Sequence, residues 1–170
     1  MKIRREKESD YENIYSLVKE AFASVSYSDG NEQKLVSNLR QGDSYIPELS
    51  LVLEIDGKIV GHILFAKAFV GEYPVLPLAP LSVLPDYQRQ GIGIMLVKKS
   101  HKIAVALGFD YSVVLGSNKY YSRFGYVSAT KFGIIPPFDV PSENFMAIKL
   151  KENTIVISEL MKYAMEFGID

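Results

Sequence analysis

The chain has 170 residues, of which 48% are hydrophobic and 23% are charged, and its formal net charge is −1. These values predict a single globular domain and exclude a general attraction to nucleic acid or to an anionic membrane. The chain has no cysteine, which excludes disulfides, thiolate metal sites and a cysteine nucleophile, and its two histidines argue against a metal centre. We therefore expect no bound metal. Because the charged N-terminal residues precede no apolar run and no stretch approaches transmembrane length, we expect a cytoplasmic protein.

The first third of the chain predicts one strand and two helices. Residues 1–6 are expected to form a short strand. Ser9-x-x-Glu12 is a capping-box pattern, and it opens a helix whose apolar stripe continues to Phe22. A polar segment at 24–30 leads to a second helix at 31–40, and this segment either contributes to a binding site or is a surface connection.

The next strands are marked by turn residues and by prolines. Asp56-Gly57 is a preferred hairpin turn, here between strands at 51–55 and 58–69. The following strand, 73–83, contains three prolines, which cannot donate hydrogen bonds to a neighbouring strand. This composition predicts a strand that bulges and parts from its neighbour.

The segment Gln88-Arg89-Gln90-Gly91-Ile92-Gly93 lies between that strand and a long helix at 92–107. The first N–H groups of a helix have no partner within it, and glycine lets a phosphate approach the backbone, so the turn is a candidate anion site. It lacks the lysine of a P-loop, and Asp110 lies before a strand and not after one, which argues against a dinucleotide fingerprint. The exposed face with Lys98, Lys99 and Lys102 either contacts a ligand phosphate or is a solvated helix surface.

The last third contains a second distinctive pattern. Gly108 ends the long helix, and the almost continuously apolar residues 109–115 predict a buried strand parallel to 73–83. The sequence then continues through Asn118, Tyr121 and Gly125-Tyr126. Residues 131–140 predict a loop or irregular strand and 145–150 another strand, whereas 158–167 fits either a final helix or an irregular tail.

Taken together, the two patterns resemble the GNAT superfamily of acetyl-CoA-dependent N-acetyltransferases. Gln88, Gly91 and Gly93 match its pyrophosphate motif Gln/Arg-x-x-Gly-x-Gly/Ala, and Asn118 and Tyr121 match the short helix that follows its fifth strand. The resemblance implies an α/β (α+β) fold, a single domain with a mixed central sheet of about six to seven strands flanked by helices. Strands four and five of that sheet, 73–83 and 109–115 here, splay apart. The GNAT-like domain is expected at 1–150, and 151–170 forms a C-terminal extension packed on it.

The resemblance also implies transfer of an acetyl group from acetyl-CoA to a primary amine by direct attack, without a covalent enzyme intermediate. The acceptor is a small-molecule or peptide amine that the sequence does not specify, and both a monomer and a homodimer remain open. The implied cofactor-binding residues lie on strand four, in the turn and on the short helix: Leu81, Ser82, Val83, Gln88, Arg89, Gln90, Gly91, Ile92, Gly93, Asn118 and Tyr121.

The implied catalytic roles are divided among a few groups. Tyr121 matches the position of the general acid, and the backbone N–H of Val83 is the simplest donor to the oxyanion. No acid lies on strand four, so the candidate base is His62, which is otherwise a structural histidine, and a water chain or an amine that arrives neutral would need no protein base. His101 is expected on a helix surface. Two rival interpretations are a non-catalytic acyl-CoA-binding regulatory or interaction domain and a nucleotide- or phosphosugar-binding α/β protein.

Overall fold

The computed structural model divides into two compact units, which share strand β5 and helix α3. The structure describes residues 1–152 and 157–169. The first unit comprises Met1–Phe65 and Ala79–Ile103, and the second comprises Ala66–Leu78 and Ala104–Asp170.

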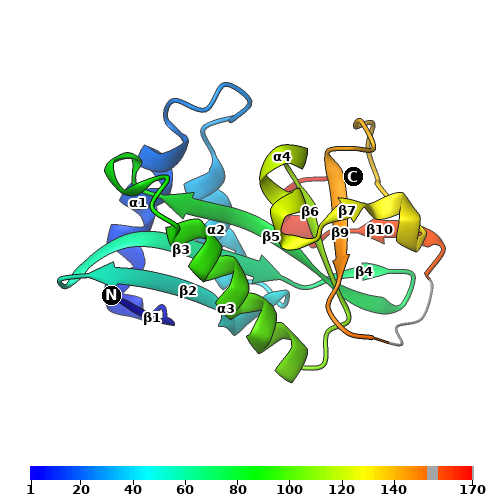
Figure 1. Cartoon of the computed structure of the whole chain (residues 1–170), viewed down its shortest axis with the longest axis horizontal. Helices are drawn as coiled ribbons and strands as arrows, with labels where there is room; N and C mark the ends of the chain where they lie inside the picture. The colour runs from blue at the N-terminus through cyan, green and yellow to red at the C-terminus, as the bar shows by residue number, and fades with distance from the viewer. Residues whose placement is uncertain (153–156, 170) are drawn as a thin grey trace. The chain divides into compact units, whose positions relative to one another are not determined.

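The first unit is an antiparallel group of strands with helices on both faces. The strand order is β1-β2-β3-β5, and β1 pairs with β2 from Lys2 opposite Glu54. Helix α3 lies on one face of β2 and β3, and α1 and α2 lie on the other (Figure 1). The elements of this unit are β1 (Lys2–Arg5), α1 (Tyr11–Phe22), α2 (Glu32–Arg40), β2 (Tyr45–Ile55), β3 (Lys58–Ala66), the end of β5 (Tyr73–Val83) and most of α3 (Ile92–Ala106).

Two glycines explain the local geometry of β3. Asp56 and Gly57 both have positive φ angles, 50° and 79°, as a type I′ hairpin turn requires. Gly61 faces α3, and a Cβ atom there would lie 2.9 Å from Cγ2 of Ile92 and 3.0 Å from Cδ1 of Leu96. The absence of a side chain at Gly61 therefore lets α3 pack directly on the strand.

The second unit extends from the first half of β5 in two directions. On one side, β5 pairs in parallel with β6, with Leu76 opposite Ser112, and β6 continues to β9 and β7. On the other side the order is β4-β10-β8. The further elements are β4 (Ala68–Val70), β6 (Tyr111–Leu115), α4 (Asn118–Tyr121), β7 (Val127–Ser128), β8 (Ile134–Ile135), β9 (Phe145–Lys149) and β10 (Glu159–Lys162).

The expected fold class is confirmed, namely a single α/β domain with a mixed sheet and a parallel β5–β6 pair. In the described ranges the sheet has ten strands and not six or seven, because the chain also forms short strands such as β4, β8 and β10. The expected strand 58–69 is interrupted at Lys67, which separates β3 from β4. No helix in the part of the chain that the structure describes is long and apolar enough to cross a membrane.

Two local expectations were wrong or incomplete. Ser9 does not cap α1, because it lies inside a 3-10 turn at Glu8–Asp10, and the carboxylate of Asp10 instead accepts a hydrogen bond of 2.9 Å from the Lys7 N–H. The segment 158–167 is neither a helix nor wholly irregular, since β10 is followed by a 3-10 turn at Met165–Phe167. The expected domain boundary near residue 150 stays a prediction, and residues 153–156 and 170 of the extension lie outside the described residues.

Candidate functional site

The turn before α3 has the backbone of an anion site. Arg89 and Gly91 have φ angles of 61° and 85°, so two of four consecutive residues are left-handed. The N–H of Met95 donates to the Gly91 carbonyl at 3.0 Å, so the N–H groups of the preceding turn of α3 have no helical carbonyl to bind. A Cβ atom on Gly91 would meet no protein atom within 4 Å. The backbone at this point is therefore open to a ligand.

Both glutamines of the turn bind its own backbone. The side-chain amide of Gln88 donates to the Val83 carbonyl at 3.0 Å, and that of Gln90 donates to the Asp86 carbonyl at 3.1 Å. The N–H of Leu84 donates to the Val60 carbonyl at 2.9 Å. The peptide between Val83 and Leu84 is thus held at both ends, which fixes the end of β5 relative to the turn.

The end of β5 presents alternate residues to its two edges. Because the Leu84 N–H points to β3, the Val83 and Leu81 N–H groups point to the opposite edge. The side chain of Ser82 is buried, with 1% of the residue exposed, and its hydroxyl has no hydrogen-bond partner within the described residues. This geometry leaves the backbone of Leu81 and Val83, and not the Ser82 side chain, for a ligand at that edge.

Tyr121 belongs to the second unit and ends α4, the short helix after the buried strand that the family resemblance implied. The helix is capped by Ser117, whose hydroxyl accepts a hydrogen bond from the Tyr120 N–H at 3.3 Å, while Asn118 is an exposed first residue. The half-buried Tyr121 ring stands edge-on to Tyr120 and Tyr126, with centroid distances of 5.0 Å and 5.8 Å.

Gly116 and Asn144 position this ring. The Gly116 N–H donates to the Asn144 carbonyl at 2.9 Å, and the Asn144 side-chain amide donates back to the Gly116 carbonyl at 3.1 Å. A Cβ atom on Gly116 would lie only 2.6 Å from Cε2 of Tyr121. The ring therefore occupies the space that a side chain at residue 116 would need.

The model of the acetyltransferase (GNAT) family matches residues 11–126. The chain belongs to the GNAT family of acetyltransferases. It is 31% identical to the uncharacterized N-acetyltransferase YhbS of Escherichia coli K12 over 171 residues, with 99% of both proteins covered. It is 37% identical over 124 residues to a second Escherichia coli K12 protein, the uncharacterized N-acetyltransferase YjhQ, covering 70% of this chain and 68% of YjhQ.

Solved structures agree with this assignment. A GNAT family acetyltransferase from Brucella melitensis in complex with acetyl-CoA matches with a TM-score of 0.82 and 29% identity, covering 98% of this chain and 97% of that one. Escherichia coli YhbS in complex with CoA matches with a TM-score of 0.88 and 28% identity, covering 98% of this chain and 91% of that one. The expected family and enzyme class, an acyltransferase, are thereby confirmed.

The structure of this acetyltransferase favours the structural interpretation of His62. The residue is 0% exposed, and its Nε2 atom lies 3.2 Å from both the Ser50 hydroxyl and the Glu6 carboxylate. Burial lowers the pKa of His62, and the neighbouring Glu6 opposes this shift only in part. An enclosed, engaged ring of this kind is poorly suited to accept a proton from a substrate.

Glu6 is the centre of a buried polar network that the sequence did not reveal. Its carboxylate accepts two hydrogen bonds from the Arg40 guanidinium, at 2.8 Å and 2.9 Å, and one from the Tyr45 hydroxyl at 2.6 Å. Burial raises the pKa of Glu6, but the donors around it outweigh burial and hold its pKa well below the ordinary value. The network joins the residue that follows β1 to α2, β2 and β3, which lie far apart in the sequence.

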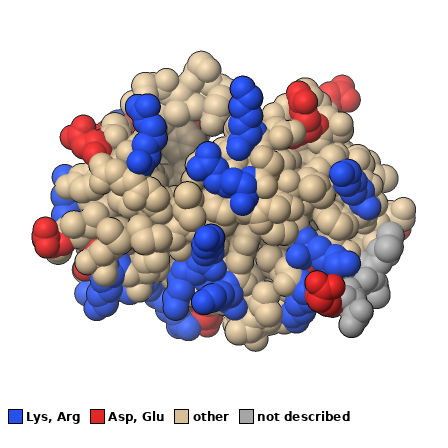
Figure 2. All heavy atoms as spheres, in the orientation of Figure 1, with Lys and Arg blue, Asp and Glu red and all other residues tan. Residues whose placement is uncertain are grey.

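Helix α3 presents its lysines as expected, but not its histidine. Lys98, Lys99 and Lys102 are exposed, and basic side chains are prominent on the face of the molecule that shows α3 (Figure 2). His101 is half-buried and lies edge-on to Phe65 at a centroid distance of 6.2 Å, so the expectation of a surface histidine was wrong. Burial lowers the pKa of His101 to about 4. Within the described residues, no group of three or more His, Asp or Glu side chains could hold a metal ion.

Sequence reasoning missed the roles of Gly61, Gly116 and Asn144, because the partners of Gly61 and the hydrogen bonds between Gly116 and Asn144 join positions that are distant along the chain. An isolated glycine in a strand signals a close approach, and Gly61 carried that signal. Asn144, by contrast, follows a proline-containing loop and had no feature that marked it as a partner of Gly116.

Proposed function

We propose that this protein transfers the acetyl group of acetyl-CoA to a primary amine by direct attack. The observation that carries the proposal is the left-handed pair Arg89 and Gly91 at the open N-terminus of α3, in a chain similar to proteins crystallised with acetyl-CoA or CoA. Backbone N–H groups and the positive end of the helix dipole at this turn suit a pyrophosphate. The proposed cofactor segment is Gln88–Gly93.

The pantetheine arm is proposed to pair with the end of β5. The N–H groups of Leu81 and Val83 point away from β3, so the amides of an extended ligand can pair at Leu81 as a strand does, while the Val83 N–H meets the thioester oxygen at the end of the arm. Gln88 supports this arrangement indirectly, because its amide holds the Val83 carbonyl. Asn118, at the start of α4, is also proposed to contact the cofactor, because it matches the family motif.

The chemistry needs an oxyanion donor and an acid. The neutral amine attacks the thioester carbon, and the Val83 N–H stabilises the oxyanion of the tetrahedral intermediate. The carbon–sulfur bond then breaks, the thiolate takes the proton of the Tyr121 hydroxyl, and the amine loses its proton to water, from which the Tyr121 oxygen is reprotonated. No side chain becomes acetylated. We assign no protein base, because His62 is enclosed and bound to Glu6.

The turn is tested by Gly91→Gln, with Gly57→Gln as the matched control. Both glycines have positive φ, 85° and 79°, and both have open space where a Cβ atom would lie, so the two variants share the same backbone strain. Calorimetry should show that Gly91→Gln weakens acetyl-CoA binding by about tenfold or more, the value of one or two charge-assisted hydrogen bonds, while Gly57→Gln keeps the wild-type affinity. If the two folded variants bind acetyl-CoA with equal affinity, the turn is not part of the cofactor site.

The reaction itself is tested with a library of amines and an assay for released CoA thiol. Acetylation of at least one primary amine, with equal amounts of acetylated product and thiol, is expected. Tight binding of acetyl-CoA without transfer to any amine would instead support the non-catalytic acyl-CoA-binding alternative.

A further inference from the structure

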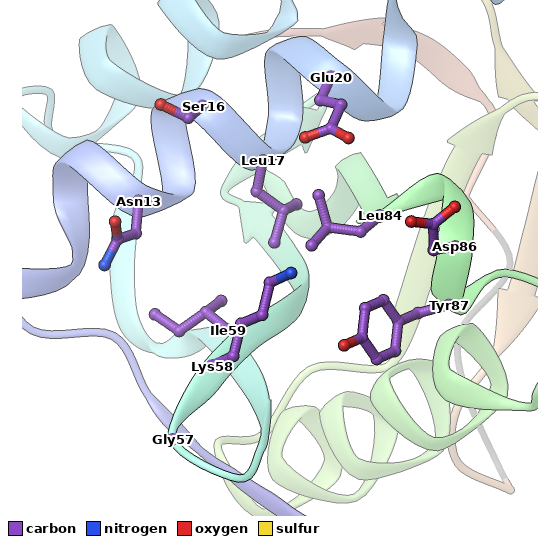
Figure 3. Close-up of a pocket in the computed structure, with 10 residues that line it drawn as sticks. All are labelled: Asn13, Ser16, Leu17, Glu20, Gly57, Lys58, Ile59, Leu84, Asp86 and Tyr87. Atoms are coloured by element: carbon purple, nitrogen blue, oxygen red, sulfur yellow. The ribbon is translucent and has the colours of Figure 1, made fainter.

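The first unit contains a pocket that the proposed reaction does not use. Its volume is about 400 Å³, which lies within the range of small-molecule sites. Helix α1, the β2–β3 hairpin and the segment that follows β5 form its walls (Figure 3). Every lining residue belongs to the first unit.

The floor of the pocket is apolar. Leu17 from α1 and Leu84 after β5 are 3% and 8% exposed, and Ile59 from β3 is half-buried. Leu17 and Leu84 lie beside each other, and Ile59 lies further along on the side of the hairpin (Figure 3). A branched aliphatic group of a ligand would bury its surface against them, which is favourable at about 25 cal/mol per Å².

The rim carries charges of both signs. Glu20 reaches the pocket from α1 and Asp86 from the segment after β5, while the Lys58 ammonium enters from the hairpin, on the side of the Tyr87 ring (Figure 3). Lys58 is held over the Tyr87 ring, with its nitrogen 5.4 Å from the ring centroid, and the Tyr87 hydroxyl also faces the pocket. Within the described part of the chain, neither carboxylate has a hydrogen bond or an ion pair.

We infer that this pocket binds a small zwitterion with an aliphatic side chain, of the chemical class of a free α-amino acid. The ammonium of such a ligand lies between Glu20 and Asp86, and its carboxylate meets Lys58 and the Tyr87 hydroxyl. A simple amine would leave the Lys58 charge beside its own, and a simple carboxylate would face two acids. A zwitterion satisfies both signs of charge with no net charge of its own.

None of the residues that line the pocket is assigned above to acetyl-CoA or to the reaction. An ammonium held by two carboxylates is stabilised in its protonated form, and a protonated amine has no lone pair to attack a thioester. The ligand therefore binds without being acetylated at this site. The inference goes beyond the proposed function and can be tested without acetyl-CoA.

The direct test is an NMR titration of the methyl-labelled protein with L-leucine. Saturable shifts are expected for the methyl groups of Leu17, Ile59 and Leu84. The two one-charge analogues, 3-methylbutylamine and 4-methylpentanoate, should each bind more weakly than L-leucine by about two- to fivefold, the usual value of a solvent-exposed ion pair. Absence of saturable shifts at these methyl groups, or an amine that binds as tightly as L-leucine, would overturn the inference.

Two variants locate the charges, and a third is the control. Glu20→Gln should weaken L-leucine and the amine but not the carboxylate, whereas Lys58→Met should weaken L-leucine and the carboxylate but not the amine. Glu12→Gln removes an exposed acid of the same helix outside the pocket and should change nothing. Equal effects of Glu20→Gln and Glu12→Gln, or acetylation of L-leucine that depends on Glu20, would contradict the proposed mode of binding.

Discussion

The role of Tyr121 can be tested without removing any of its atoms, through Gly116. An alanine at residue 116 would place its Cβ atom 2.6 Å from Cε2 and 3.1 Å from Cδ2 of the Tyr121 ring. Carbon atoms in contact lie about 3.5–4.0 Å apart, so one side must move by about 1 Å. The backbone of Gly116 is held by two hydrogen bonds to Asn144, and we expect the ring to move instead.

A displacement of this size has a large catalytic consequence if the Tyr121 hydroxyl is the acid. Misplacing a reacting group by 1 Å costs up to about 10²-fold in rate, which is also the usual share of general acid catalysis. Gly116→Ala should therefore lower kcat by about 10- to 100-fold, and Tyr121→Phe by about 100-fold. Acetyl-CoA affinity should change little in either variant.

The assay is steady-state release of CoA thiol by the single and double variants, with Tyr120→Phe as the control. Tyr120 belongs to the same helix and stacks under the Arg123 guanidinium, 4.6 Å from its ring centroid, so loss of its hydroxyl should leave turnover near that of the wild type. In the double variant, Gly116→Ala should add nothing to Tyr121→Phe, because both changes remove the same proton donor.

Three results would refute this reasoning. Full activity of Tyr121→Phe would exclude the hydroxyl as the acid. A large loss of turnover in Tyr120→Phe would show that the role of the acid has been assigned to the wrong tyrosine. Multiplying effects in the double variant would show that Gly116 acts on turnover through something other than the Tyr121 hydroxyl.

Three further predictions concern the frame around the site. Gly61→Ala should lower the free energy of unfolding by about 1–3 kcal/mol in urea denaturation, because its Cβ atom overlaps Ile92 on α3, and a wild-type midpoint would contradict the close packing. Ser82→Ala should leave the acetyl-CoA affinity within about twofold in calorimetry, because the hydroxyl is buried. A large loss of affinity would show instead that the hydroxyl is a ligand. Glu6→Gln should lower the free energy of unfolding by about 3 kcal/mol at pH 7, because it leaves Arg40 buried without its charged partner. The folded-state pKa of Glu6 is depressed, so this difference should be complete above about pH 4.5 and shrink as the pH falls further, and a constant difference in melting temperature across pH 3–7 would contradict it.

The sequence by itself determined the elements whose signals are local. The hairpin at Asp56-Gly57, the turn at Gln88–Gly93, the long α3 helix and the short α4 helix each depend on residues within a few positions of one another, and all were found where predicted. Backbone conformation at a glycine and the apolar period of a helix are decided by the neighbouring residues, so the sequence exposes them directly. The family resemblance depends on the same short motifs.

Only the tertiary structure decided what those elements meet. The pairing of β10 between β4 and β8, the enclosure of His62 by Glu6 and Ser50, and the Asn144 clamp on Gly116 all join residues far apart in the chain. A histidine in a strand has the same local pattern whether it faces solvent or a buried carboxylate, and a short strand such as β10 is stable only between its two partners. The roles of these residues therefore follow only from burial and long-range hydrogen bonding in the folded chain, because no local signal in the sequence distinguishes a buried structural role from an exposed one.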